Sequence, residues 1–348
     1  MVVINWTGNG DKSSWFDQAN WENNAIPGST DDVVINVEGN RTIQIDNSVN
    51  VNSLNSSENL RVIDGALNIT NGLILASGVT LKVDGATASV LVNGGSNSNI
   101  DGSSLYAVNG GSISLPGLTS YVSGDNHETY IQADGTGSKI DLPSLTSLPG
   151  GGYFDHRNIN ALNGGEIDLS GVTSIPSGAT EIRANGSGSL VNLSNLNEFI
   201  DNDYDDSLIE STDGGTINVG KLTDLNAVSI VFDNTNNLNT PTSQIVNFTN
   251  ASITADGVTP DLRGLVNIDG SSLYAVNGGS ISLPGLTSYV SGDNHETYIQ
   301  ADGTGSKIDL PSLTSLPGGG YFDHRNINAL NGGEIDLSGV TSIPSGAT

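Results

Sequence analysis

The chain of 348 residues contains no cysteine, and its single methionine is Met1. The absence of cysteine excludes a disulfide framework, a thiol nucleophile and a zinc site with cysteine ligands, so packing and hydrogen bonding must stabilise the fold. A chain body without sulfur also tolerates oxidants, which suits a location outside the cell. We therefore expect an extracellular or cell-surface protein.

Positive charge is also scarce, because 11 lysine and arginine residues face 38 aspartate and glutamate residues, for a formal net charge of −27. Contacts to phosphate need clustered basic side chains, so this balance argues against nucleic acid or an anionic membrane surface as a partner. The sequence also lacks a run of about 18 apolar residues, the minimum for a membrane-spanning helix. We expect no nucleic-acid partner and no insertion into a membrane.

Repetition is what the sequence has in abundance. Residues Asn99–Thr180 recur as Asn267–Thr348, at an offset of 168 positions and without a substitution. Natural copies drift, so an exact copy indicates either a recent duplication kept uniform by recombination or a chain assembled by hand. Both explanations favour a scaffold over an enzyme with a single active site, and we expect no catalytic activity.

A shorter repeat lies inside the long one. Its reference residues are spaced by 27, 27, 24 and 26 positions: Ile113, Ile140, Ile167, Val191 and Ile217. Apolar residues follow two and five positions later, and a small residue precedes each by six or seven positions: Ala107, Ala133, Ala161, Ala184 and Ser211. Short alternation broken by glycine, proline, asparagine and serine is typical of very short strands with one buried face.

A unit of about 25 residues with three short strands matches one coil of a parallel β-helix, which buries its apolar columns only by stacking coils. Leucine-rich repeats are the main alternative, because Leu142-Pro-Ser-Leu-Thr-Ser-Leu148 resembles their consensus. However, the apolar period of a helix is missing, and glycine, asparagine and serine fill the corners. The sequence therefore predicts an all-β fold, a parallel β-helix (β-solenoid) with coils of roughly 20–27 residues.

Four parts are expected along the chain. They are an N-terminal cap segment (residues 1–40), a short-coil β-helix (41–98), a β-helix repeat unit (99–266) and a partial second copy of that unit (267–348). The segment from Val228 to Leu265 fits the spacing poorly, so we expect a longer, looped coil there.

The first 35 residues differ from the rest and contain all three tryptophans, Trp6, Trp15 and Trp21. Trp-x-Gly, then Asn-Trp, then Pro-Gly-x-x-Asp-x-Val-x-Ile ending at Ile35 resembles the opening of many bacterial secreted and autotransporter-like β-helical surface proteins. The resemblance covers about a tenth of the chain. It implies a right-handed β-helix and an extracellular, adhesin-like or matrix protein, and it assigns no catalytic residue.

The tryptophan segment itself has two interpretations. Bulky aromatics at the end of a solenoid cover unpaired strand edges and open core, so we interpret the segment as a cap. The alternative is a sugar-stacking site on exposed tryptophan rings.

One acidic loop is a calcium candidate. Four carboxylates within six residues supply the hard oxygen ligands that Ca²⁺ prefers: Asp201, Asp203, Asp205 and Asp206. The loop lacks the glycine and the closing glutamate of an EF-hand, and the glycine-rich nonapeptide of calcium-binding β-rolls is missing from the sequence. A solvated acidic loop without metal is the preferred alternative, and no other cofactor is expected.

A second group of polar residues occupies the same corner of two consecutive coils: His127, Glu128, Asp155, His156 and Arg157. Aligned on the repeat, Glu128 lies over His156 and His127 lies over Asp155. Such a surface cluster has the chemistry for acid–base catalysis or metal binding. A cross-coil ladder of ion pairs is the simpler explanation, because the carboxylate pattern of β-helical pectin-cleaving enzymes is not recognisable.

A regular column of outward threonines on a flat solenoid face can bind ice, and this chain has one such column. It contains one threonine per coil and is interrupted at Asn197: Thr119, Thr146, Thr173 and Thr223. Ice-binding faces present an array two threonines wide, so we interpret these residues as ordinary strand positions.

Taken with the resemblance, these patterns predict a structural or adhesive rod of a repetitive bacterial surface, matrix or filament protein. We expect it to self-associate through coil ends or sides and to contact cell-surface glycan. The alternative is a polysaccharide-binding or polysaccharide-cleaving β-helix of the phage tail-spike or lyase type. Aromatics and carboxylates gathered in one groove favour that alternative, whereas their separation over different corners favours the rod.

Overall fold

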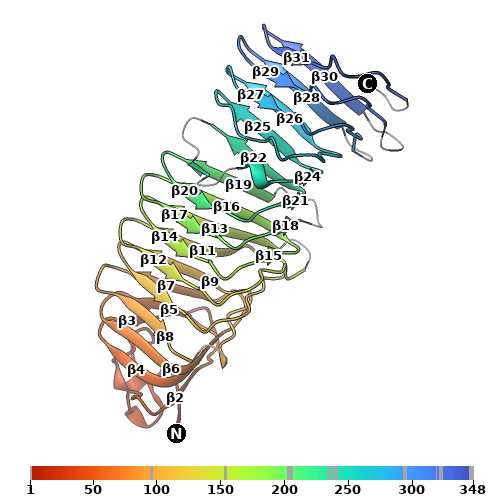
Figure 1. The fold of residues 1–348 in the computed structure, drawn as a ribbon. Helices are drawn as coiled ribbons and strands as arrows, with labels where there is room; N and C mark the ends of the chain where they lie inside the picture. Colours follow the sequence, from red (N-terminus) through yellow and green to blue (C-terminus); the bar gives the residue numbers. More distant parts are fainter. Residues whose placement is uncertain are drawn as a thin grey trace.

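The structure is a computed structural model that describes residues 2–94, 97–152, 155–201, 207–233, 237–238, 242–292, 296–318, 320 and 324–344. The chain forms a parallel β-solenoid of about 12 turns, which confirms the predicted fold class. Figure 1 shows the coils stacked into an elongated rod, with the N-terminus at one end and the C-terminus at the other.

The longest sheet runs along the whole rod and has 13 strands. Its order is β3 (Thr42–Ile45), β5 (Asn59–Val62), β7 (Thr80–Asp84), β9 (Ser104–Val108), β11 (Thr129–Asp134), β13 (His156–Leu162), β16 (Ala179–Asn185), β19 (Ser207–Thr212), β22 (Val228–Phe232), β25 (Ser252–Asp256), β26 (Ser272–Val276), β28 (Glu296–Asp302) and β30 (His324–Leu330).

A second sheet has 11 strands. Its order is β1 (Val3–Asn5), β2 (Asp32–Ile35), β4 (Val49–Ser56), β6 (Ala66–Leu75), β8 (Ser89–Val92), β10 (Ser112–Ser114), β12 (Lys139–Asp141), β14 (Glu166–Asp168), β17 (Leu190–Asn192), β20 (Thr216–Asn218) and β23 (Asn237–Leu238).

Two short sheets complete the coils. One contains β15 (Ser174–Ile175), β18 (Glu198–Ile200), β21 (Asp224–Asn226) and β24 (Asn247–Thr249), and the other contains β27 (Ser280–Ser282), β29 (Lys307–Asp309) and β31 (Glu334–Asp336). Helical structure among the described elements is limited to single turns: η1 (Gln18–Asn20), η2 (Glu22–Asn24) and η4 (Thr242–Gln244). The leucine-rich-repeat alternative, which needs longer helices or a different curvature of coils, is therefore not supported.

The apolar columns that the sequence predicts are the columns of the core. Ile113 pairs with Ile140, and the pairing continues strand by strand through Ile167 and Val191 to Ile217. The small residues form a second column in the 13-stranded sheet, and every member of both columns is buried. Each coil therefore contributes one rung to a continuous core, which only stacking closes off from water.

Coil length varies far more than the register does. The coil that leads from Ile43 to its register partner Leu60 is much shorter than the coil that leads from Ile131 to its partner Ile159. The extra residues of the longer coil lie at its corners, so β11 and β13 stay in register, whereas the pair of β4 and β6 has a register shift after Val51.

The prediction of a longer, looped coil between Val228 and Leu265 is wrong. Ile209 pairs with Ile230, and Ile230 pairs in turn with Ile253, so both steps are shorter than the step from Ile131 to Ile159. The spacing fitted poorly because this part of the chain uses different residue types in the same columns, such as Phe232 opposite Ala255.

A repeated corner follows the long strands and depends on glycine. In Asn163-Gly164-Gly165 the first two residues have φ of 52° and 89°, so the chain turns through two left-handed positions. A Cβ atom on Gly165 would lie 2.2 Å from the carbonyl oxygen of Ala133 in the preceding coil. The corner therefore requires glycine at its last position to let the coils approach each other.

The two identical segments fold alike. The offset between the sequence copies relates β9, β10, β11, β12, β13 and β14 to β26, β27, β28, β29, β30 and β31. The pairings coincide as well, since Ala133 pairs with Ala107 and Ala301 pairs with Ala275. β9 and β26 are seven strands apart in the 13-stranded sheet, so one repeat unit corresponds to seven coils.

Candidate functional site

The predicted corner cluster has the predicted alignment. Thr129 pairs with Arg157. The residues directly before them, Glu128 and His156, are therefore neighbours in the same register. In the second copy this pair is itself part of the ladder, since Glu296 pairs with His324.

Among the described residues, the members of the cluster nevertheless form no hydrogen bond or salt bridge with one another. The ring nitrogens of His127 lie 2.9 Å from the carbonyl oxygens of Asp125 and Gly102, and the carboxylate of Glu128 accepts a hydrogen bond from the hydroxyl of Tyr130. Among the described residues, none of the five predicted cluster members forms a salt bridge. The predicted ladder of ion pairs is therefore wrong, because backbone carbonyls and a tyrosine have taken the place of the charged partners.

Asp155 points inward and is buried. Its Oδ2 accepts hydrogen bonds from Ser123 Oγ at 2.8 Å and from the backbone N–H of Gly151 at 2.5 Å. These bonds fix the loop that precedes the next strand, so the carboxylate has a structural environment and no exposure to a substrate.

Arg157 is also buried, beneath the same corner. Its guanidinium donates to the carbonyl oxygens of Leu148 and Pro149 at 3.1 and 2.5 Å, and to Thr180 Oγ1 at 3.1 Å. Burial lowers the pKa of Arg157 from its ordinary value. The side chain ties three segments of neighbouring coils together, and sequence analysis had placed it on the surface.

One of the four calcium candidates lies in the described part of the chain. Asp201 is described and fully buried, and its Oδ2 accepts a hydrogen bond from Ser207 Oγ at 2.7 Å. Asp203, Asp205 and Asp206 lie outside the described residues. Within the described part of the chain, no group of three or more histidine, aspartate or glutamate side chains is arranged to hold a metal ion.

The tryptophan segment is packed inward. Trp6, Trp15 and Trp21 are at most 3% exposed, and both Trp6 and Trp15 meet Trp21 edge to face, with ring centroids 4.8 and 4.7 Å apart. Trp21 Nε1 also donates to the carbonyl oxygen of Trp15 at 2.6 Å. Rings this deeply buried offer no face to a sugar, which argues against the sugar-stacking alternative, and the interpretation as a cap stays a prediction.

Three threonines of the column are exposed, Thr223 is half-buried, and two of the four hydroxyls form hydrogen bonds. Thr173 Oγ1 donates to the carbonyl oxygen of Thr146 at 3.1 Å, and Thr223 Oγ1 donates to that of Asn197 at 3.2 Å. These bonds join successive coils. The prediction of ordinary strand positions is wrong, because all four threonines lie outside the strands.

A pair of tyrosines on the outer face of the 13-stranded sheet was missed by sequence analysis. The rings of Tyr106 and Tyr130 stack with centroids 5.8 Å apart and planes inclined by 27°. The hydrogen bond to Glu128 raises the pKa of Tyr130 to about 12. Side chains alternate between the two faces of each strand, so both rings lie on the outer face while Ala107 and Ala133 of the same strands are buried. This alternation is visible in the sequence and could have identified the pair.

The tyrosine pair occurs twice on the same face. Tyr274 and Tyr298 stack with centroids 6.1 Å apart and planes inclined by 28°, and the hydroxyl of Tyr298 donates to Glu296. The two pairs are seven strands apart. At about 4.8 Å per strand, roughly 34 Å separates them.

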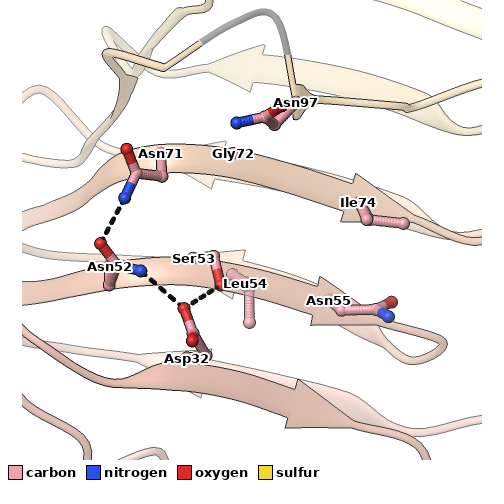
Figure 2. A pocket seen from close by; sticks show the side chains of 9 residues that line it. All are labelled: Asp32, Asn52, Ser53, Leu54, Asn55, Asn71, Gly72, Ile74 and Asn97. Carbon is pink, nitrogen blue, oxygen red and sulfur yellow. Dashed lines mark hydrogen bonds between the residues drawn. The ribbon is translucent and has the colours of Figure 1, made fainter. Parts of the chain in front are cut away.

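A shallow groove lies on the other long sheet, across β2, β4 and β6. It has a volume of about 460 Å³ and is lined mainly by amide side chains, with one carboxylate and one exposed isoleucine: Asp32, Asn52, Ser53, Leu54, Asn55, Asn71, Gly72, Ile74 and Asn97. Figure 2 shows Asn71, Asn52 and Asp32 in a row across three strands, joined by hydrogen bonds. Ser53 and Asn52 both donate to Asp32 and lower the pKa of its carboxyl group.

No family model, curated protein or solved structure matches the chain. Among the described residues, the helices are single turns, and none is long and apolar enough to cross a membrane. The β-solenoid fold is shown, whereas membership of the secreted β-helical surface proteins stays a prediction from the motif between Trp6 and Ile35.

Proposed function

We propose that the protein is an extracellular structural or adhesive rod that presents identical surface patches at a fixed interval. The proposal rests on one observation: the tyrosine pairs Tyr106–Tyr130 and Tyr274–Tyr298 lie on one sheet, in one register, seven strands apart. Two patches held at a fixed interval can contact a repetitive surface at the same time. Once the first patch has bound, the second contact is intramolecular, so the overall affinity is higher than that of either patch alone.

The composition of the rod supports this role. Its stability comes from stacked ladders, and without cysteine it uses no disulfide. A net charge of −27 keeps such a rod soluble and separate from anionic polymers.

Self-association is part of the same proposal. The stacked tyrosine pairs lie on the outer face along one sheet, so two rods can place these aromatic faces against each other side by side. Sedimentation velocity over a concentration series tests this part. A chain that stays monomeric throughout, or one whose association is unchanged by Tyr130→Ala with Tyr298→Ala, contradicts it.

The polysaccharide-cleaving alternative has less support. In the described part of the chain, the tyrosine pairs, the amide groove and the buried Asp155 and Asp201 occupy separate places, and Asp32 is the only carboxylate that lines the groove. Hydrolysis of a glycosidic bond uses two carboxyl groups on either side of that bond. We therefore propose a rod without catalytic activity.

The rod geometry is tested by distance measurement. Because the chain has no cysteine, Thr119→Cys and Thr287→Cys together give two unique spin-label positions on equivalent exposed corners. Pulsed electron resonance is expected to give one narrow distribution centred near roughly 34 Å. A broad distribution or a much shorter mean distance contradicts a rigid rod.

Adhesion is tested by retention of the fluorescent chain on intact bacterial cells. Tyr130→Ala removes one pair, and Tyr130→Ala with Tyr298→Ala removes both; Thr119→Ala with Thr287→Ala is the matched double control. We expect the first variant to lose about tenfold or more in retention, since avidity is lost, and the second to lose nearly all. Failure of the unmodified chain to adhere, or equal retention of all variants, contradicts the adhesive role.

A further inference from the structure

The groove across β2, β4 and β6 exists because the register of two strands shifts. Val51 pairs with Ile69, but Ser53 pairs with Gly72, so β6 has one residue more than β4 over this stretch. Such bulges bend a strand and redirect its side chains. Here the bulge brings Asn71 beside Asn52, and Asn71 Nδ2 donates to Asn52 Oδ1 at 2.5 Å.

Gly72 forms the floor of the groove. A Cβ atom at this position would lie 2.8 Å from the carbonyl oxygen of Asn97, so only glycine allows the segment at Asn97 to approach β6. Leu73 N donates to Ser98 Oγ at 3.0 Å, and Ile74 forms a parallel bridge with Asn99. These contacts fix Asn97 at the rim.

The groove contains polar groups that have no partner in the fold. The side-chain amides of Asn55 and Asn97 are exposed and make no hydrogen bond within the described part of the chain. Figure 2 places them on opposite sides, with Asn97 above Gly72 and Asn55 beyond Leu54. Ile74 lies on β6, on the same strand as Gly72, and its side chain, which is 41% exposed, is the apolar element of the groove.

This chemistry excludes several ligands. A cation is disfavoured because Asn52 Nδ2 and Ser53 Oγ already donate to Asp32 Oδ1, both at 2.6 Å, and surround that oxygen with hydrogen atoms. An anion is disfavoured by the same carboxylate and by the net charge of −27. A peptide strand is disfavoured because the groove crosses interior strands, whose backbone groups are paired.

We infer that the groove binds a neutral saccharide. Amide side chains both donate and accept, as paired sugar hydroxyls require, and the exposed isoleucine matches the C–H surface of a pyranose ring. The volume of about 460 Å³ falls in the range of about 300–1,000 Å³ that is usual for small-molecule sites.

The site is separate from the tyrosine pairs, so its test is independent of the rod proposal. Calorimetric titration uses cellohexaose, maltohexaose and mannohexaose as neutral probes and an oligogalacturonate as the anionic control. We expect at least one neutral probe to bind and the anionic one not to bind. Asn97→Ala, Asn55→Ala and Ile74→Asn are each expected to weaken binding by about tenfold, which corresponds to about 1.4 kcal/mol.

Asn68→Ala is the matched control. Asn68 lies on β6 and its Nδ2 donates to Asn50 Oδ1 at 3.0 Å, in an amide pair of the same kind that does not line the groove. Its replacement is expected to leave binding unchanged. Thermal melts show whether each variant is folded, and Asn55 and Asn97 are exposed enough to be replaced without loss of the fold.

Three outcomes overturn the inference. They are a lack of binding to all the neutral probes at millimolar concentration, binding that the groove variants leave intact, and binding that Asn68→Ala weakens as much as they do. Retention of the chain on cells through the tyrosine pairs is unaffected by any of these results.

Discussion

The guanidinium carbon of Arg157 lies 5.8 Å from the centroid of the Tyr121 ring, and both side chains are buried. Arg325 and Tyr289 repeat the arrangement at 5.0 Å in the second copy. A cation over an aromatic face is stabilised by the ring quadrupole. The pair fills the interior of a corner where an apolar side chain would leave carbonyl groups without donors.

Arg157→Met is expected to lower the free energy of unfolding by about 2–4 kcal/mol, because the carbonyls of Leu148 and Pro149 lose their donors inside the protein. Arg183→Met is the control: Arg183 is 36% exposed and its salt bridges to Glu181 and Glu210 are worth less than about 1 kcal/mol. Urea denaturation of both variants makes the comparison. Equal losses would show that burial of Arg157 is not what stabilises the corner.

Leu142→Asp is expected to cost about 3 kcal/mol or more, because Leu142 is fully buried and a carboxylate there would have no donor. Asp141→Ala changes the adjacent outward position, which accepts one hydrogen bond from Ser114 Oγ at 3.2 Å. Its cost should stay within about 1 kcal/mol. Thermal melts distinguish the two, and a larger loss for Asp141→Ala would mean that the inward and outward positions are reversed.

Gly165→Ala is expected to destabilise the protein by about 1–3 kcal/mol, since the new Cβ would overlap the carbonyl oxygen of Ala133, 2.2 Å away. At Gly220 the nearest atom to an added Cβ is 3.6 Å away, and φ is not positive. Gly220→Ala should therefore change stability by less than about 0.5 kcal/mol. If chemical denaturation gives equal midpoints for both variants, the coils are not packed as closely at Gly165 as described.

Tyr130 is expected to ionise near pH 12, because its hydroxyl donates to the carboxylate of Glu128. The folded protein holds this proton more tightly than the unfolded chain, whose tyrosine pKa is about 10. The resulting stabilisation is complete below about pH 10 and is lost as the pH rises from there to about 12.

NMR of ¹³C-labelled tyrosine follows this ionisation directly. Glu128→Gln should lower the pKa of Tyr130 toward its ordinary value, whereas Glu166→Gln on another strand should not. An unchanged pKa in Glu128→Gln would assign the shift to burial instead.

The core could be predicted from the sequence because each column repeats one kind of side chain. Ile113 and its partners follow one another at nearly constant spacing, and hydrophobic burial fixes both the strand and its inward face. The same alternation carried through β13 puts Arg157 on the inward side with Ile159. Its charge led to a surface assignment, although parity along the strand already indicated burial.

The amide groove could not be predicted in the same way. It depends on the register shift after Val51 and on the close approach that Gly72 permits. Neither feature gives a periodic pattern in the sequence. A bulge is a single extra residue, and Gly72 cannot be distinguished by sequence from the many glycines that form turns. Contacts between residues on successive coils, such as Asn52 with Asp32, are set by that local geometry.

The exact repeat has a consequence for how such a rod changes length. A crossover between residues 99–180 and 267–348 removes or adds one whole repeat unit, which is seven complete coils. The shortened product stacks its repeat on β7, as β9 does now, and a lengthened product stacks each added unit on a copy of β25, as β26 does now. Every junction in either product already exists in this chain. Genetic exchange can therefore extend the molecule in steps of about 34 Å without the selection of a single new contact, and each step adds a tyrosine pair to the same sheet.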